Sequence, residues 1–195
     1  MISLPARSSA RLAPIGSKRL LLFPIEGSDA RELWCAVQES RKYLEPWLPW
    51  VPFQVDESSM HRFAEACAMD WDSGRAIRFV IRERETRTLV GVVGLENCTP
   101  MHACCDLGYW LREPAQGRGY MTEAAGILIQ EAFDKYHMHR IRVAAATTNY
   151  RSLSVIGRLG FRFEGIARQA EYCAGRWLDH AQFGMLVTDH AARRP

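Results

Sequence analysis

The stretch that decides the fold reads Leu107-Gly-Tyr-Trp-Leu111 and, four residues later, Gln116-Gly-Arg-Gly-Tyr-Met-Thr-Glu-Ala124. The first part is predicted to be a strand, and the second is predicted to be a glycine-containing turn that opens a helix. Such a turn directs several backbone N–H groups and the positive end of the helix at one point, which suits a phosphate or a pyrophosphate. Its two glycines permit positive φ angles and let ligand oxygens approach the backbone closely. The segment therefore predicts an anion-binding turn.

The spacing of these glycines differs from both common nucleotide-binding motifs. The chain has no G-x-x-x-x-G-K-[ST] segment, and the turn does not follow the G-x-G-x-x-G pattern after a first strand. A G-x-G turn by itself is more often a structural turn than a binding site. Its interpretation therefore depends on the rest of the chain.

The surrounding residues predict one α+β domain with the element order β-α-α-β-β-β-α-β-α-β-β. Only the passage 104–147 favours a parallel crossover, because a helix there separates two strands. The single domain is expected at 18–189, between a flexible basic arm at 1–17 and a short tail at 190–195. Helices are predicted at 28–40, 57–69, 119–137 and 152–159, and strands at 18–25, 76–82, 89–97, 104–111, 140–147 and on both sides of a hairpin at Ala174-Gly175.

The positive charge of the chain is concentrated at its ends. The formal net charge is +3, but six of the 25 basic residues lie in 1–25 and 193–195, which contain no acidic residue. Residues 26–192 therefore carry 19 basic against 22 acidic side chains, a net charge of −3. This balance disfavours nucleic-acid binding by the domain and suits a cationic acceptor. No apolar run reaches the roughly 20 residues that a membrane span requires.

The six cysteines indicate neither a redox motif nor a metal site. None belongs to a C-x-x-C pair. In the one cluster, His102-Ala-Cys-Cys105, the adjacent cysteines of a strand point to opposite faces and do not readily share a metal. Scattered reduced thiols are typical of a cytoplasmic protein, and the first residues lack the apolar region of a secretion signal. We therefore expect a cytoplasmic protein without a metal cofactor or a membrane partner.

Further motifs give the turn a functional interpretation. Gln116, Gly119 and Met121 occupy the three fixed positions of Q/R-x-x-G-x-G/A, and the chain resembles the GCN5-related N-acetyltransferase (GNAT) superfamily over 18–188. It is most similar to the branch that acetylates the N-termini of ribosomal proteins (the RimJ/RimL type), in which a Met at this position is familiar. The other segments that carry this resemblance are Asn149-Tyr-Arg-Ser152, Leu159-Gly-Phe161, Glu164-Gly165, Gln169-Ala-Glu-Tyr172 and Trp177-Leu-Asp179.

The resemblance implies an acetyl-CoA-dependent enzyme with a GNAT-like fold. Its central sheet would be mixed and mostly antiparallel, partly split at the parallel pair, and flanked by about four helices. The strands that end at Leu111 and Thr147 would separate, with the pantetheine arm between them. Asn149 would hydrogen-bond this arm, and a backbone N–H near Trp110 or Leu111 would face the acetyl carbonyl. The pyrophosphate would bind the turn formed by Gln116, Gly117, Arg118, Gly119, Tyr120 and Met121, with the Arg118 side chain as a further contact.

Two side chains are predicted to move protons. An α-amino group with a pKa of about 7.7–8.0 must lose a proton before it attacks a thioester, and the departing thiolate must gain one. The resemblance assigns the first task to Glu171, and Asp106 and Glu96 on the central strands remain alternatives. It assigns the second task to Ser152, which would also contact the cofactor, although a serine at a helix start is equally explained as an N-cap. Tyr150 is the alternative proton donor.

These features predict direct transfer of an acetyl group from acetyl-CoA to an amine in a ternary complex. The favoured acceptor is the N-terminal α-amino group of a protein such as a ribosomal protein. The alternatives are a small-molecule amine (an aminoglycoside, a polyamine or an amino acid) and a non-catalytic acyl-CoA-binding module, against which the presence of both Ser152 and Glu171 argues. Trp47 and Trp50 are equally explained as a wall of the acceptor site and as packing. A homodimer remains compatible with the resemblance.

Overall fold

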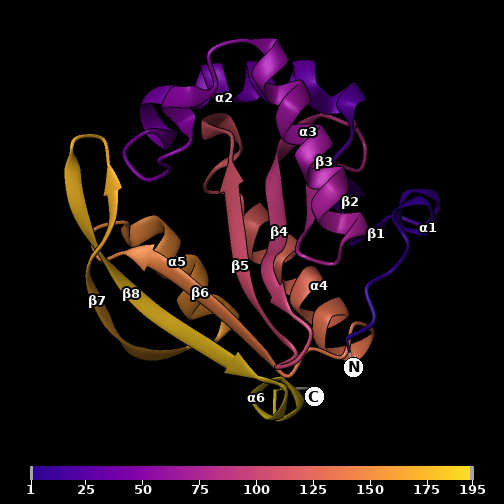
Figure 1. Ribbon diagram of the computed structural model, residues 1–195, viewed down its shortest axis with the longest axis vertical. Helices are drawn as coiled ribbons and strands as arrows, with labels where there is room; N and C mark the ends of the chain where they lie inside the picture. The colour runs from indigo at the N-terminus through magenta and orange to yellow at the C-terminus, as the bar shows by residue number, and fades with distance from the viewer. Residues whose placement is uncertain (1, 194–195) are drawn as a thin grey trace.

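One eight-stranded sheet organises the protein, as the computed structural model in Figure 1 shows for residues 2–193. The strand order is β1-β2-β3-β4-β5-β6-β8-β7, and every neighbouring pair is antiparallel except β5 and β6. The predicted mixed, mostly antiparallel sheet is confirmed. The strands are β1 (Ile15–Gly16), β2 (Leu20–Pro24), β3 (Ile77–Glu83), β4 (Leu89–Thr99), β5 (Cys104–Leu111), β6 (Arg140–Ala146), β7 (Arg162–Cys173) and β8 (Arg176–Leu186).

Four long helices flank the sheet, as predicted, and cover both of its faces (Figure 1). One buried cluster joins α4 and α5 to one face, and a second joins α2 and α3 to the other. Leu128 and Ile129 of α4 belong to the first cluster, and burying a side chain of this size contributes about 1.5–3 kcal/mol. The helices are α1 (Arg7–Leu12), α2 (Ala30–Leu44), α3 (Glu57–Asp72), α4 (Tyr120–Asp134), α5 (Tyr150–Leu159) and α6 (Val187–Ala191), with short 3-10 turns at Gly27–Asp29, Val51–Phe53 and Glu113–Ala115.

The sheet divides at its one parallel pair. Strands β5 and β6 pair only through Cys104, Cys105 and Asp106, which lie opposite Arg140, Ile141 and Arg142. Beyond this point β5 stays paired with β4 and β6 with β8, so the two strands diverge (Figure 1). The predicted partial split is confirmed. It leaves the inner edges of both strands without a strand neighbour, which opens space for a ligand between them.

The two ends of the chain contain more regular structure than the sequence predicted. Within 1–17, where a flexible arm was expected, the structure has α1 and the short strand β1. The Nε1–H of Trp71 donates to the carbonyl of Pro5 (2.8 Å), and the N–H of Ser3 donates to the carbonyl of Tyr136 (3.1 Å). These elements were missed because they are short, and Trp71 is 66 residues away from its partner. The flexibility of this arm remains a prediction.

The C-terminal boundary also differs by a few residues. Strand β8 ends at Leu186, and the next residues form α6, so the predicted tail at 190–195 begins inside that helix. Residues 194–195 lie outside the described part of the chain. No helix within 2–193 is both long and apolar enough to cross a membrane.

Candidate active site

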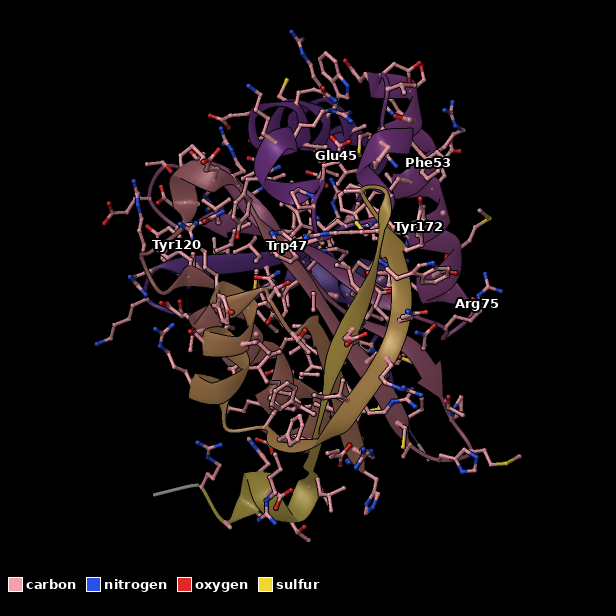
Figure 2. The ribbon with its side chains drawn as sticks, turned by 90° about the vertical axis from the view of Figure 1, so that its left-hand side faces the viewer. Glu45, Trp47, Phe53, Arg75, Tyr120 and Tyr172 are labelled. Atoms are coloured by element: carbon pink, nitrogen blue, oxygen red, sulfur yellow. The ribbon has the colours of Figure 1, made fainter. Side chains whose placement is uncertain are left out.

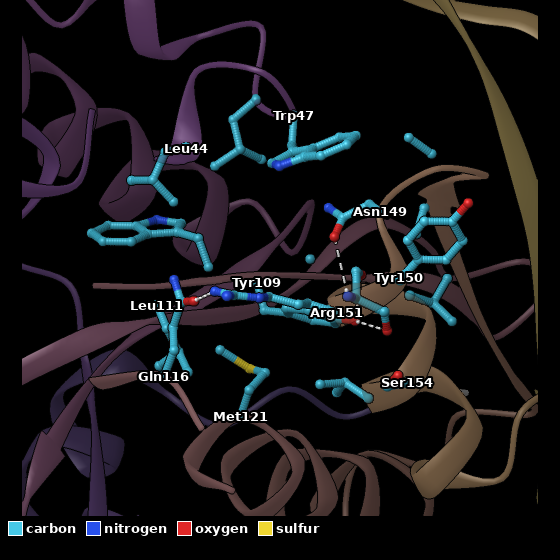
Figure 3. Close-up of a pocket in the computed structure, with 18 of the residues that line it drawn as sticks. Leu44, Trp47, Tyr109, Leu111, Gln116, Met121, Asn149, Tyr150, Arg151 and Ser154 are labelled. Carbon is cyan, nitrogen blue, oxygen red and sulfur yellow. Dashed lines mark hydrogen bonds between the residues drawn. The ribbon is translucent and has the colours of Figure 1, made fainter. Parts of the chain in front are cut away.

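A cleft of about 1380 Å³ opens where β5 and β6 diverge. One wall consists of β5 and the turn before α4, and the other consists of β6, α5 and the β7–β8 hairpin, with residues 43–50 closing a third side (Figure 3). The structure brings most of the sequence-predicted site residues together here. Those that line the cleft are Trp110, Leu111, Gln116, Gly117, Gly119, Tyr120, Met121, Asn149, Tyr150, Ser152 and Glu171.

The glycine turn leads into α4, whose N-terminus has no side-chain cap. Gly117 and Gly119 have φ angles of 74° and 77°, a region that disfavours residues with a Cβ atom. Gly119 is the N-cap of α4, and no side chain hydrogen-bonds to cap the helix there. The first N–H groups of a helix have no partner within the helix itself. At α4 these groups are therefore available to an anion in the cleft.

Gln116 connects this turn to the opposite wall. Its Oε1 accepts a hydrogen bond from Nη1 of Arg151 in α5, and Figure 3 shows the two side chains meeting across the cleft. Its Nε2 is buried and has no hydrogen-bond partner among residues 2–193. A buried amide without a partner is costly in the free protein. This nitrogen can therefore donate to a ligand oxygen that enters the turn.

Arg118 is the one residue of the turn whose side chain leaves the cleft. Its side chain is 57% exposed, and its Nη1 lies 3.6 Å from Oε1 of Glu83. The side chain is not part of the cleft lining, whereas its neighbours on both sides are. The Arg118 side chain is directed toward β3, and its contact with the pyrophosphate stays a prediction.

The backbone N–H groups of Trp110 and Leu111 point in opposite directions. The N–H of Arg112 donates to the carbonyl of Val90 in β4 (2.9 Å). Because N–H groups alternate in direction along a strand, the N–H of Trp110 also points toward β4, while that of Leu111 points into the gap on the other side of β5. Of the two predicted backbone donors, Leu111 is the one directed into the cleft. Trp110 contributes its side chain, whose ring centroid lies 6.2 Å from that of Trp50.

Helix α5 begins with a side-chain cap. Asn149 is its N-cap, and the Oδ1 atom of Asn149 accepts a hydrogen bond from the N–H of Ser152 (3.2 Å; Figure 3). Ser152 therefore lies in the first turn of the helix. It is not the N-cap, which was one of the two interpretations of this serine. Its hydroxyl is free of that structural task, and its Oγ lies 2.9 Å from the hydroxyl of Tyr109 on β5. Burial raises the pKa of Tyr109 to about 12, so this phenol stays protonated at neutral pH.

A bulge in β7 brings Glu171 to the cleft. Ala167 lies opposite His180 and Glu171 lies opposite Leu178, so three residues of β7 face a single residue of β8 between these pairs. Such an insertion bends a strand and redirects its side chains. The N–H of Gln169 in the bulge, where φ is 48°, donates to Oδ1 of Asp179 (2.7 Å). Oε2 of Glu171 then lies 3.5 Å from Nε2 of His180, and both side chains line the cleft.

The two alternative carboxylates lie elsewhere. Nε of Arg78 donates to Oε1 of Glu96 (2.7 Å), and Nε of Arg142 donates to Oδ1 of Asp106 (2.6 Å). Neither acid belongs to the cleft lining. Each is engaged by an arginine on a neighbouring strand, which favours Glu171 as the carboxylate that can reach a ligand.

The aromatic segment between α2 and α3 packs against other parts of the chain and also lines the cleft. Trp47 packs against Ala146, Cys173 and Leu178 and also lines the cleft. Figure 2 shows Trp47 and Glu45 near the hairpin that carries Tyr172, and the Sγ of Cys173 contacts the carbonyl of Glu45 (3.2 Å). The segment therefore fixes the hairpin and forms a wall of the cleft at the same time.

Comparison with known proteins identifies the family of this chain. A family model described as an acetyltransferase (GNAT) domain matches residues 19–162. The chain belongs to the GNAT family of acetyltransferases. The predicted superfamily and enzyme class are therefore confirmed, together with the fold.

This GNAT enzyme has relatives in several bacteria. It is 28% identical to the "[Ribosomal protein uS5]-alanine N-acetyltransferase" of Escherichia coli (strain K12), over 94% of this chain and 95% of that protein. It is 36% identical to the "Probable N-acetyltransferase YjcK" of Bacillus subtilis (strain 168), over 88% of this chain and 96% of that protein. Among solved structures, a RimL ribosomal L7/L12 alpha-N-protein acetyltransferase in complex with coenzyme A is similar in fold, with a TM-score of 0.85 and 22% identity over 89% of this chain and 97% of that one. The predicted resemblance to the RimJ/RimL branch is confirmed.

Sequence reasoning missed two residues of this GNAT site. Tyr109 belongs to the decisive stretch, and strand alternation places it on the same face as Leu107 and Leu111, beside the turn. His180 directly follows the segment Trp177-Leu-Asp179. No local pattern marks either residue, because Tyr109 meets Ser152 from another part of the chain and His180 meets Glu171 only through the register of the β7–β8 hairpin.

Proposed function

We propose that this GNAT enzyme transfers the acetyl group of acetyl-CoA directly to the α-amino group of a protein N-terminus, that of a ribosomal protein, in the cytoplasm. The observation that carries the proposal is one cleft that holds the uncapped glycine turn on one wall and Ser152 and Glu171 on the other. The names of the relatives support the acceptor, since one is a ribosomal-protein-alanine and another a ribosomal-protein-serine acetyltransferase. Solved structures of similar fold contain coenzyme A or acetyl-CoA, which supports the donor.

The residues of the cleft fit such a donor. The N–H groups at the start of α4 and the unpartnered Nε2 of Gln116 are donors for the oxygens of a pyrophosphate. Gly117 has open space where a Cβ atom would lie, so phosphate oxygens can approach the backbone there. The gap between β5 and β6 accommodates an extended chain, and the amide of Asn149 faces this gap. Acetyl-CoA, when bound, supplies the thioester whose acyl group is transferred.

The chemistry requires an unprotonated amine next to this thioester. An α-amino group is mostly protonated at neutral pH. Glu171 takes its proton, directly or through a water molecule, and the amine nitrogen then bonds to the acyl carbon. The N–H of Leu111 stabilises the negative charge that develops on the acyl oxygen. As the carbon–sulfur bond breaks, the nitrogen releases its second proton to water, and the hydroxyl of Ser152 donates a proton to the leaving sulfur. The hydroxyl of Tyr109 can replace the proton that Ser152 gives up, and Tyr109 regains its own from solvent.

Holding the two reactants together supplies a large part of the acceleration. Orientation in a ternary complex contributes about 7–11 kcal/mol in favourable cases, while general acid–base assistance contributes about 10²–10⁴-fold. Loss of one proton-transfer group is therefore expected to slow the enzyme without abolishing activity.

The acceptor is tested by detecting acetyl transfer through the intact mass of candidate acceptors. The panel contains short peptides with free Ser, Ala or Thr N-termini, the same peptides with a blocked N-terminus and an internal lysine, spermidine, and an aminoglycoside. Acetylation of the free peptides but not of the blocked ones is expected. Acetylation of spermidine or the aminoglycoside alone would indicate a small-molecule enzyme. No product at all, with acetyl-CoA demonstrably bound, would indicate a non-catalytic binding module.

A further inference from the structure

Arg19 joins the start of β2 to the glycine turn. Its Nη1 donates a hydrogen bond to the carbonyl oxygen of Arg118 (3.1 Å), 99 residues further along the chain. Its Nε donates to Oε2 of Glu123 in the first turn of α4 (2.7 Å). Its guanidinium carbon lies 5.0 Å from the ring centroid of Tyr120. One side chain from the N-terminal part of the molecule thus contacts three consecutive parts of the turn and of the helix that follows.

The position of Arg19 is itself well fixed. The N–H of Arg84 donates to its carbonyl oxygen (2.8 Å), and its own N–H donates to Oγ of Ser17 (3.1 Å). Ser17 also hydrogen-bonds Oε1 of Glu123, so both carboxylate oxygens of Glu123 are engaged. Burial works against the charged form of Glu123, but the hydrogen bonds from Ser17 and Arg19 outweigh it and hold its pKa below the usual value. Glu123 is therefore ionised and paired.

The contact with Arg118 sets the direction of a backbone donor. A trans peptide is planar, so its C=O and N–H groups point in opposite directions. A guanidinium that binds the Arg118 carbonyl oxygen therefore fixes the direction of the Gly119 N–H in the same peptide. Gly119 lines the cleft, and Nη2 of Arg19 lies 3.7 Å from the place that a Cβ atom on Gly119 would occupy. The guanidinium thus supports the turn from the side that faces away from a ligand.

The contact with Glu123 changes the charge at the helix start. An acid in the first turn of a helix is favourable for the helix dipole, but it repels an anion bound at the same end. Arg19 neutralises this carboxylate. Without Arg19, the turn would have a less defined backbone and an unpaired negative charge beside its N–H groups.

We propose that Arg19 is a positioning residue for the diphosphate group of the acetyl donor. It orients the Gly119 N–H through the Arg118 carbonyl and neutralises Glu123, without contacting the donor itself. This inference rests on the proposed function, because it assumes that the turn holds a pyrophosphate. The effect of Arg19 is confined to the part of the donor that carries phosphate.

The test compares two acetyl donors, acetyl-CoA and S-acetylpantetheine, which has the same thioester but no diphosphate. In Arg19→Ala the KM for acetyl-CoA is expected to rise about tenfold to a hundredfold, the effect of losing hydrogen bonds to charged groups. The kcat/KM for S-acetylpantetheine is expected to stay within about twofold of wild type, because the reacting end of the cleft is untouched. Arg84→Ala is the matched control, since Arg84 donates to the carbonyl of Ser17 (2.9 Å) and makes no described contact with the turn.

Two further variants test the two parts of the inference separately. Arg19→Ala/Glu123→Gln lacks the unpaired carboxylate, so its KM for acetyl-CoA is expected to lie between those of Arg19→Ala and wild type. Arg19→Lys restores the charge but cannot hold both partners, so it too is expected to be intermediate. Thermal unfolding of each variant shows whether it is folded at the assay temperature.

Each result decides one claim. An equal loss with both donors in Arg19→Ala would overturn the inference, since a general structural role would then explain it. An unchanged KM for acetyl-CoA in a folded Arg19→Ala would also overturn it. If the wild-type enzyme has the same kcat/KM for acetyl-CoA and for S-acetylpantetheine, the turn does not hold the pyrophosphate. The inference about Arg19 then fails as well.

Discussion

Strands β5 and β6 both run into a helix at the cleft, but the two helices start in different ways. Helix α4 begins at Gly119, whose backbone is in the left-handed conformation and which has no side chain to cap the helix. Helix α5 begins at Asn149, whose side chain accepts a hydrogen bond from the N–H of Ser152. An N-cap side chain typically contributes about 0.5–2 kcal/mol. Helix α4 lacks this stabilisation in the free protein and keeps its N–H groups available, whereas α5 satisfies its own.

Under the proposed function, this difference divides the cleft into a binding wall and a reacting wall. The β5–α4 side offers backbone donors to an anion, while the β6–α5 side and the β7–β8 hairpin carry Ser152 and Glu171. Variants of the first wall are expected to change the affinity for acetyl-CoA. Variants of the second are expected to change kcat or the stability of the fold.

The largest expected effect is on the binding wall, with Gly117→Asp. A Cβ atom on Gly117 would enter open space on the cleft side of the turn, so the new carboxylate would lie next to the pyrophosphate. Two like charges about 4 Å apart near a protein surface repel by about 4 kcal/mol. Affinity for CoA, measured by isothermal titration calorimetry, is therefore expected to fall about a thousandfold. Gly117→Asn is the matched control, because it introduces the same backbone strain without the charge. Unchanged CoA binding in Gly117→Asp would show that the turn does not hold the pyrophosphate.

The next effect concerns the reacting wall, with Glu171→Gln. The amide keeps the size of the side chain but cannot accept a proton, so kcat is expected to fall about a hundredfold, within the usual range for a general base. The KM for acetyl-CoA is expected to stay the same. Steady-state kinetics measure both quantities. A wild-type kcat would exclude Glu171 as the base.

A smaller change in kcat is expected for Ser152→Ala. A thiol with an ordinary pKa of about 8.5 leaves as a thiolate with little assistance, so the loss of a proton donor should cost only about tenfold. Tyr109→Phe removes the partner of Ser152 but keeps the serine hydroxyl, and its effect should be weaker than that of Ser152→Ala. If Tyr150→Phe slows the enzyme while Ser152→Ala does not, the proton donor is Tyr150.

The smallest effect tests the cap of α5. Asn149→Ala loses the side-chain oxygen that accepts from Ser152, which is expected to cost about 1 kcal/mol and to lower Tm by about 2–4 °C. Asn149→Asp keeps an oxygen cap but lacks the amide donor. A normal Tm with a raised KM for acetyl-CoA in Asn149→Asp would separate the contact with the pantetheine arm from the cap. An unchanged KM in both variants would leave Asn149 only its structural role.

Sequence patterns predicted the elements that local chemistry defines. The turn at 116–121 is contiguous, so its glycines, its strand and its helix are visible together in one stretch of sequence. The order of long helices and strands was predicted for a related reason, because alternation and helical periodicity are local properties. The short elements α1 and β1 were missed, since each is stabilised by residues from other parts of the chain.

The positions of the side chains on the reacting wall could not be predicted without the tertiary structure. Glu171 was predicted from resemblance alone, and it reaches the cleft because a bulge held by Asp179 redirects β7. His180 lies beside Glu171, and Tyr109 lies beside Ser152. No spacing rule gives the length of a bulge or the pairing of strands from different parts of the chain.

The amino-acid sequence by itself thus determined the family, the order of the main elements and the glycine turn before α4, because these depend on residues close together in the chain. Tertiary structure alone decided which carboxylate reaches the cleft, that Leu111 and not Trp110 directs its N–H into it, and that Arg19 supports a turn 99 residues away. The physical reason is the separation of β5 from β6. Two strands that part expose inner edges to which distant segments contribute side chains, and those contributions depend on register and packing across the whole sheet.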